Sequence, residues 1–242
     1  RGIAREAYLT MSRVVIESID TRDHVDLSWA VPETSGEGWK ALQTHVATGR
    51  GALLVTAHFA NWERAGKLLV QRGIPLDALV RPLKGALNMR IVDNRVAAGV
   101  GLIYPKGAIA RIQEAVGLGE SVFMLLDQAM PAKASVFVPF FGRAASTTPA
   151  MAVVARRTGA PVFVVMGVRD ASGRTMRLEV EGPIPAPQGL EEQEAIVAHT
   201  AAVTAALERH VRRHPGQWLW LHRRWKTLPP PEALAPRGQE PG

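Results

Sequence analysis

A regular alternation of two patterns, beginning at residue 52, constrains the fold more than any other feature of this sequence. Apolar runs of strand length are separated by stretches with helical periodicity. The apolar runs are ALLVTAH (52–58), LDALV (76–80), SVFMLL (121–126) and PVFVVMGV (161–168), and the helical stretches are 62–72, 86–98, 107–118 and 149–158. Strands that alternate with helices are typical of layered α/β folds with a largely parallel sheet. The sequence therefore predicts an α/β fold with a mainly parallel central sheet flanked by helices.

The segments before and after this alternation also carry secondary-structure signals. Apolar residues recur at helical spacing in 1–20 and 37–48. The segment MRLEVE (176–181) alternates like a half-exposed strand at the edge of a sheet. A long amphipathic pattern predicts a helix at 190–213, and QWLWLH (217–222) is interpreted as a last strand.

The domain organisation follows from length and from the distribution of proline. We expect one domain over residues 1–228, with 1–50 as its helical N-terminal part. The proline-rich stretch 229–242 is expected to be a surface tail. No run approaches the roughly 20 apolar residues that a membrane-spanning helix needs, and there is no signal peptide. Residue 1 is arginine rather than methionine, which leaves room for an upstream membrane anchor.

Composition limits the chemistry and the kind of partner. The chain has no cysteine, which excludes disulfides, a thiol nucleophile and cysteine metal ligands. The net charge of +7 indicates an anionic partner: nucleic acid, a phospholipid surface or a phosphorylated substrate. Residues 209–226 hold six cations interleaved with Trp218, Trp220 and Trp225. Tryptophan with lysine and arginine suits a lipid headgroup layer. Because no nucleic-acid-binding motif is visible, we favour a membrane surface over nucleic acid.

The junction HFANWE (58–63) places chemistry-bearing residues at the end of an apolar strand. Ligands of α/β sheets gather outside the carboxyl ends of strands, so His58 stands where a catalytic base would be expected. Asn61 can cap the following helix, with Glu63 in its first turn. Glu63 would then orient the imidazole and leave its other nitrogen free as a general base. Spacing alone does not separate this interpretation from a buried core histidine beside a helix-terminal glutamate.

Other catalytic or metal-binding signatures are absent or weak. There is no G-x-S-x-G, P-loop, G-x-G-x-x-G or H-E-x-x-H motif. His210 and His214 have a spacing that can hold zinc, but they lie among arginines at a helix end. We therefore expect a solvated helix end there, and neither a metal nor a cofactor.

Several blocks occur in order along the chain and together resemble a known family. They are HFANWE (58–63), VRPLK (80–84), LLDQ (125–128), VFVPFFG (136–142) and QWLWLHRRWK (217–226). The sequence resembles the lipid A biosynthesis acyltransferases, lauroyl- and myristoyl-transferring enzymes of the lysophospholipid acyltransferase superfamily. The resemblance covers about residues 1–228, and it implies the fold of that superfamily.

The resemblance implies a role for each matching residue. The family's H-x4-D/E motif falls on His58 as catalytic base and Glu63 as its acid. Arg81 is implied to hold a phosphate, and Asp127 to shape the floor of the site or to anchor Arg81 or Arg95. The candidate substrate-binding residues are Asn61, Arg81, Arg95, Asp127 and Gln128. Without the other blocks, Arg81 is equally an ordinary surface cation and Asp127 an ordinary loop cap.

The expected function is O-acyl transfer from an acyl thioester to a glycolipid hydroxyl. The donor would be an acyl thioester of acyl-carrier protein or of coenzyme A, which is a co-substrate rather than a bound cofactor. The acceptor would be an anionic glycolipid such as a lipid A precursor, met at the cytoplasmic face of the bacterial inner membrane. Three alternatives remain open: another lipid acceptor (a phosphatidylinositol mannoside or a lysophospholipid), a non-catalytic module that binds lipid or acyl carrier, and a nucleic-acid binder.

Overall fold

The computed structural model describes residues 2–19, 28–31, 34–82 and 85–230. Its centre is a six-stranded sheet in the order β3-β2-β4-β1-β7-β8, in which only β8 is antiparallel to its neighbour. The strands are β1 (Leu53–Thr56), β2 (Leu76–Leu79), β3 (Gly101–Ile103), β4 (Ser121–Leu125), β7 (Val162–Arg169) and β8 (Met176–Ile184). The prediction of an α/β fold with a mainly parallel sheet is confirmed.

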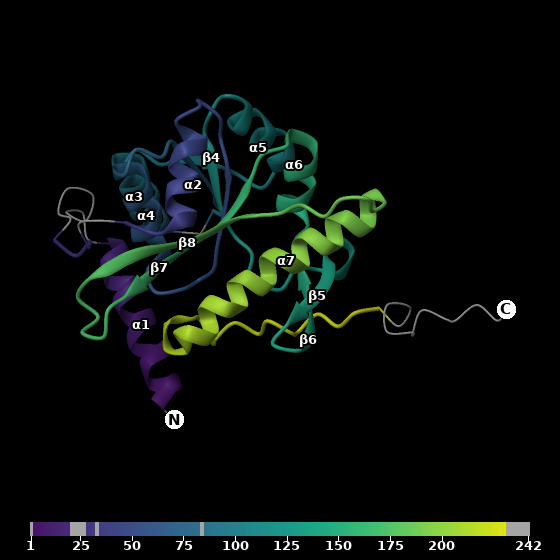
Figure 1. The fold of residues 1–242 in the computed structure, drawn as a ribbon. Coiled ribbons are helices and arrows are strands. Elements are labelled where there is room, and N and C mark those ends of the chain that lie inside the picture. The colour runs from purple at the N-terminus through teal and green to yellow at the C-terminus, as the bar shows by residue number, and fades with distance from the viewer. Residues whose placement is uncertain (1, 20–27, 32–33, 83–84, 231–242) are drawn as a thin grey trace.

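Helices cover both faces of this sheet, as Figure 1 shows. They are α1 (Gly2–Ile19), α2 (Glu37–Val46), α3 (Trp62–Gln71), α4 (Ala86–Ala97), α5 (Ala108–Gly117), α6 (Ala150–Thr158) and α7 (Glu192–Arg213). Alternate residues of a strand point to opposite faces. Accordingly, Leu53 and Val55 pack into the core shared with α5, α6 and α7, whereas Leu54 packs into the core shared with α2 and α3. Because β1 is buried on both faces, it is apolar without alternation.

Four short elements lie outside the central sheet. A hairpin of β5 (Val136–Phe140) and β6 (Arg143–Thr147) packs beside α7 (Figure 1). The 3-10 helices are η1 (Ala132–Ala134) and η2 (Pro215–Gln217).

Helix α2 approaches β8 so closely that a Cβ on Gly38 would lie 2.2 Å from the carbonyl oxygen of Val180. Only glycine permits that contact.

Most sequence-predicted elements are confirmed within two residues at each end, except that β8 extends to Ile184, three residues beyond the predicted strand. The alternation at 176–181 is indeed an edge strand, β8. Strands β3, β5 and β6 were not predicted. The predicted strand at 217–222 is wrong: the structure has η2 followed by turns, with one isolated bridge between Phe59 and Trp218. Residues 231–242, which make up most of the predicted tail, lie outside the described residues.

Candidate active site

The parallel register of β1 and β4 brings His58 and Asp127 together. Thr56 lies opposite Leu125, the last residue of β4. Two residues further along each chain, His58 and Asp127 lie side by side at the carboxyl edge of the sheet, meaning the edge where its parallel strands end. The Asp127 carboxylate accepts two hydrogen bonds from His58, one at 2.8 Å from Nδ1 and one at 2.9 Å from the His58 backbone amide.

This geometry fixes the role of each imidazole nitrogen. With Nδ1 donating to the carboxylate, a neutral imidazole carries its lone pair on Nε2 and can accept a proton there. Nε2 faces the side-chain amide of Gln128, whose Nε2 lies 3.3 Å away. The His58 side chain is 20% exposed and that of Asp127 only 3% exposed, so the imidazole is accessible and the carboxylate is enclosed. The His58 and Trp62 rings meet in a T-shaped arrangement at a centroid distance of 4.7 Å.

Asp127 is held as a carboxylate despite its burial. Loss of solvent raises its pKa, but hydrogen bonds from His58 and from the Trp218 indole outweigh that effect and hold the pKa below its ordinary value. The indole Nε1 donates to Oδ2 at 2.8 Å. A buried carboxylate in contact with the imidazole stabilises the imidazolium that forms when Nε2 takes a proton.

Glu63 does not have the partner that the sequence suggested. Its carboxylate forms a two-point ion pair with Arg95 of α4, at 2.8 Å from Nε and 2.7 Å from Nη2. The chain reverses between His58 and α3 at Ala60, whose φ of 43° lies in the left-handed region that residues with a Cβ rarely adopt. The first turn of α3 therefore directs Glu63 toward α4. The expectation that Glu63 orients His58 is corrected: Asp127 makes that contact.

Asn61 lies beneath the site and is fully buried. Its Oδ1 accepts a hydrogen bond from the Arg64 amide at 3.0 Å, which confirms the predicted cap of α3. Its Nδ2 donates to Glu17 of α1 at 2.7 Å. The Asn61 side chain therefore fixes the turn after His58, and its role in substrate binding stays a prediction.

The arginines occupy two different environments at the same edge of the sheet. Arg81 follows β2, a direct neighbour of β4, and is exposed. Arg95 is largely enclosed by its pair with Glu63. Asp127 contacts neither arginine, so its predicted role as their anchor is corrected. Arg90 on α4, Lys106 after β3 and Arg111 on α5 are also exposed cations.

The C-terminal segment, residues 217–226, supplies site residues to which sequence reasoning assigned no role. The amide of Leu219 donates to the carbonyl of His58 at 2.9 Å, and the amide of Ala60 donates to the carbonyl of Gln217 at 2.7 Å. His222 Nε2 accepts a hydrogen bond at 2.9 Å from the amide of Ala129, next to Gln128. Burial lowers the pKa of His222. The block QWLWLHRRWK was the only sequence signal for these contacts.

Part of the cationic and aromatic residues that suggested a membrane face are buried. Trp218 and Arg224 are each 1% exposed. The Arg224 guanidinium donates to Ser146 O and Thr147 Oγ1 at 2.5 Å each, and burial lowers its pKa to about 10. His210, expected at a solvated helix end, is 2% exposed and faces Glu179 and Glu181 of β8. These groups stabilise the fold rather than meet a lipid.

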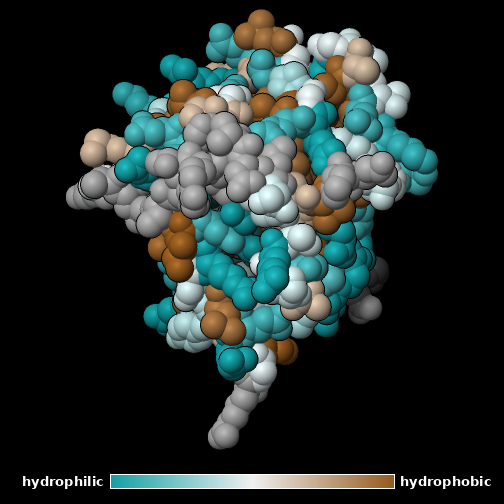
Figure 2. Space-filling model, turned by 90° about the vertical axis from the view of Figure 1, so that its left-hand side faces the viewer, coloured by the Kyte–Doolittle hydropathy of each residue, from teal (hydrophilic) through white to brown (hydrophobic). Residues whose placement is uncertain are grey.

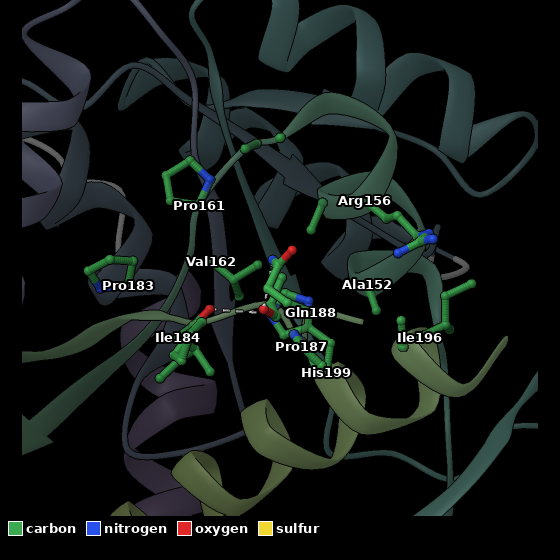
Figure 3. Close-up of a pocket in the computed structure, with 16 residues that line it drawn as sticks. Ala152, Arg156, Pro161, Val162, Pro183, Ile184, Pro187, Gln188, Ile196 and His199 are labelled. Carbon is green, nitrogen blue, oxygen red and sulfur yellow. Dashed lines mark hydrogen bonds between the residues drawn. The ribbon is translucent and has the colours of Figure 1, made fainter. Parts of the chain in front are cut away.

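A cavity of about 430 Å³ lies at the opposite edge of the sheet. Figure 3 shows it where β7 begins at Val162, with Arg156 of α6, Ile184 of β8 and His199 of α7 around it. Because His58 and Asp127 follow the carboxyl ends of β1 and β4, this cavity is separate from them. Among the residues that the structure describes, none of the helices is both long and apolar enough to cross a membrane.

Comparison with known proteins gives a consistent result. The model of the bacterial lipid A biosynthesis acyltransferase family matches residues 1–227. The lipid A biosynthesis palmitoleoyltransferase of Escherichia coli K12 is 30% identical over 196 residues, which are 80% of this chain and 61% of that protein. The lauroyltransferase of the same strain is 28% identical over 211 residues, 84% of this chain and 67% of that protein.

A third relative has a different acceptor in its name. The phosphatidylinositol mannoside acyltransferase of Mycolicibacterium smegmatis is 27% identical over 192 residues, 77% of this chain and 59% of that protein. The chain therefore spans about three-fifths of the length of the palmitoleoyltransferase and of the mannoside enzyme.

Proposed function

Because the chain belongs to the bacterial lipid A biosynthesis acyltransferase family, we propose that it is an O-acyltransferase. It moves a fatty acyl chain to a hydroxyl of a glycolipid such as a lipid A precursor. The donor is an acyl thioester of acyl-carrier protein or of coenzyme A. The observation that carries the proposal is the His58–Asp127 pair, whose imidazole Nε2 faces outward at the carboxyl edge of the sheet. A base in this position suits activation of a substrate hydroxyl.

The proposed reaction needs no covalent intermediate on the protein. The acceptor hydroxyl oxygen attacks the thioester carbonyl carbon while Nε2 of His58 takes the hydroxyl proton. Asp127 stabilises the resulting imidazolium through its 2.8 Å hydrogen bond to Nδ1. When the tetrahedral intermediate collapses, the carbon–sulfur bond breaks and the leaving thiolate takes the proton from Nε2. The products are an ester and a free thiol, and His58 returns to its neutral state.

The start of α3 is the proposed site for the oxyanion. The amides of Phe59 and Ala60 already donate to the carbonyl groups of Ala57 and Gln217. In the described part of the chain, the amides of Asn61 and Trp62 have no backbone or side-chain acceptor. The first amides of a helix point outward and carry a partial positive charge. We therefore assign the tetrahedral oxygen to these two amides.

The charged groups around the site are assigned to phosphate binding and to positioning. Arg81, exposed on the strand next to β4, is the proposed contact for a phosphate of the donor's pantetheine arm or of the glycolipid. Glu63 neutralises Arg95 and holds its guanidinium in one orientation. Gln128 rests against Nε2 of His58, where the acceptor hydroxyl must bind, and is therefore proposed to contact the acceptor.

We place the reaction at the cytoplasmic face of the inner membrane, with the protein peripheral or anchored by a further segment. Helix α1 carries exposed apolar side chains at Tyr8, Leu9, Val15 and Ile16. Figure 2 shows that the surface on the left of Figure 1 is mainly hydrophilic, with hydrophobic side chains in separate groups. Such a surface, combined with exposed arginines, fits contact with anionic headgroups better than deep insertion.

The decisive experiment is an in vitro transfer assay read by mass spectrometry. Purified protein is incubated with acyl-carrier protein or coenzyme A thioesters and a lipid A precursor, and one added acyl chain on the glycolipid is the expected product. His58→Ala should abolish transfer, whereas His45→Ala, on α2 and remote from the site, should not. Transfer by the His58→Ala variant at the wild-type rate would contradict the role of this base.

A phosphatidylinositol mannoside is the second candidate acceptor, because the Mycolicibacterium smegmatis relative carries that name. The same assay with mannoside and lysophospholipid acceptors decides between them. Absence of transfer with every donor and acceptor, with a folded protein, would favour a non-catalytic lipid-binding or carrier-binding module. Steeply salt-dependent binding to DNA or RNA would instead favour a nucleic-acid binder.

A further inference from the structure

Trp218 contacts the carboxylate that faces the proposed base. Its side chain is 1% exposed, and its indole Nε1 donates a 2.8 Å hydrogen bond to Oδ2 of Asp127. Among the described residues, Asp127 accepts three hydrogen bonds from side chains and amides, and the other two come from His58 itself. Trp218 is therefore the donor that holds the carboxylate independently of the histidine.

We propose that Trp218 is a positioning residue, whose indole N–H fixes the rotation of the Asp127 carboxylate so that Oδ1 stays directed at Nδ1 of His58. This role rests on the proposed function of the His58–Asp127 pair. A carboxylate whose only hydrogen-bond partner is the histidine can rotate together with the imidazole. A carboxylate that also accepts a hydrogen bond from a residue of the protein core has a fixed orientation, and it therefore defines where the imidazole lies.

The surroundings of Trp218 prevent its indole from following the carboxylate. The ring stacks on Phe141 at a centroid distance of 6.1 Å and meets Phe140 edge-on at 5.5 Å. Trp220 lies against it at 4.6 Å. The backbone of Trp218 is paired with that of Phe59, the residue after His58. The same few residues therefore position the indole and the base relative to each other.

The charged environment sets the expected direction of the pH effect. Besides His58, the groups that act electrostatically on Asp127 are His222 and Arg224 of the C-terminal segment. Neither of them forms a hydrogen bond with Asp127 in the described structure. Removing the indole N–H leaves the carboxylate charge with one donor fewer, so the protonated form of the His58–Asp127 pair becomes more favourable. The acidic limb of the rate profile should then move to higher pH.

The test compares Trp218→Phe with Trp220→Phe. Both changes remove an indole N–H from neighbouring tryptophans, but that of Trp220 donates to the carbonyl of Pro215 instead. We expect Trp218→Phe to lower kcat by about ten- to a hundredfold, the size expected for a lost hydrogen bond to a charged group, with KM little changed. Its acidic limb should lie at higher pH. Trp220→Phe keeps an aromatic ring beside Trp218 and should therefore keep the wild-type profile. A purely structural role predicts loss of rate without a shift of the limb, and that result would overturn the proposal.

Two further measurements make the outcome independent of folding and of the reaction. Benzothienylalanine at position 218 keeps the shape of the indole but replaces its N–H by sulfur, so it replaces the phenylalanine variant if that protein does not fold. The pH midpoint of the His58 ring resonances can be measured by NMR without substrate. It should rise in both variants at position 218, the phenylalanine and the benzothienylalanine. An unchanged midpoint overturns the positioning role even if acyl transfer is confirmed. A raised midpoint supports that role even if the wild-type protein transfers no acyl chain.

Discussion

Replacing Asp127 by asparagine changes one atom of the site and provides a severe test of the proposed mechanism. At Oδ2 the wild-type carboxylate accepts hydrogen bonds from two groups that can only donate, the His58 amide and the Trp218 indole. An asparagine must place its single oxygen there, since the alternative directs its NH2 group against both donors. Its NH2 group then faces Nδ1 of His58, which must become an acceptor. The proton moves to Nε2, and the base is lost.

The magnitude follows from the cost of the alternative orientation. Leaving a buried donor without an acceptor costs about 1–3 kcal/mol, so two such donors disfavour the productive orientation by about 2–6 kcal/mol. At about 1.4 kcal/mol per factor of ten, this corresponds to a loss of kcat between about thirtyfold and about 10⁴-fold. The upper value is comparable to the roughly 10⁴-fold loss that the same change causes in a Ser-His-Asp triad.

The assay measures initial rates of acyl transfer for wild type and Asp127→Asn, with thermal unfolding of each to confirm that both are folded. Asp170→Asn is the matched control, because this carboxylate lies in the exposed turn before β8, where it accepts hydrogen bonds from Ser172 and Arg174. We expect that control to retain the wild-type rate. A folded Asp127→Asn protein that works within threefold of wild type would refute the tautomer argument.

Three further predictions concern binding and stability. Arg81→Ala should raise KM for the phosphorylated substrate by about tenfold or more in steady-state kinetics. The control Arg50→Ala should not raise it, because Arg50 is exposed before β1 at the other edge of the sheet. Equal KM values for the two variants would contradict the phosphate role of Arg81. The hydrogen bond from His210 outweighs burial and lowers the pKa of Glu179 to about 2. Glu179 therefore stabilises the fold above pH 4.5, its ordinary value, and loses that contribution as the pH falls toward 2. The difference in unfolding free energy between wild type and Glu179→Gln should shrink over this range in urea titrations; a constant difference would contradict the assignment. Arg224→Ala should lower the unfolding free energy by about 2–4 kcal/mol through lost packing and unpaired acceptors. Replacing the exposed Arg223 by alanine should change it by less than about 0.5 kcal/mol. Similar denaturation midpoints for the two variants would contradict the stabilising role of the buried Arg224.

Elements with a strong local pattern were predictable from the sequence. Buried strands such as β1 and β7 are continuous apolar runs, and α7 has a long amphipathic stripe. Strand β3 was missed because its three residues are too few to show a period. The hairpin strand β5 was missed because Pro139 interrupts its alternation. The alternating tryptophans at 218 and 220 suggested a strand, but here a turn directs one inward and leaves the other partly exposed.

The site was predictable only as far as local sequence reaches. His58 was chosen as a candidate because it ends an apolar run. Its partner was assigned to Glu63, five residues away, whereas the actual contact is with Asp127, 69 residues away. That contact depends on the pairing of Thr56 with Leu125, and a single sequence does not contain the register of two parallel strands. His210 was misjudged for the same reason, since its acidic neighbours belong to β8 and not to its own helix.

The same dependence on distant contacts explains why α1 and the C-terminal segment belong to the site although neither contributes a proposed catalytic group. Glu17 of α1 accepts a hydrogen bond from Asn61, below the His58 turn, and forms ion pairs with Arg64 and Arg169. The backbone of Arg169 is in turn paired with the Gln217 side chain, next to Trp218. This buried network connects the turn that carries His58 to the indole that holds Asp127. Because partly satisfied buried polar groups are costly, the network favours the arrangement in which all of its members are in place. The packing of α1, β7 and η2 thus supports both the turn that carries His58 and the indole that contacts Asp127.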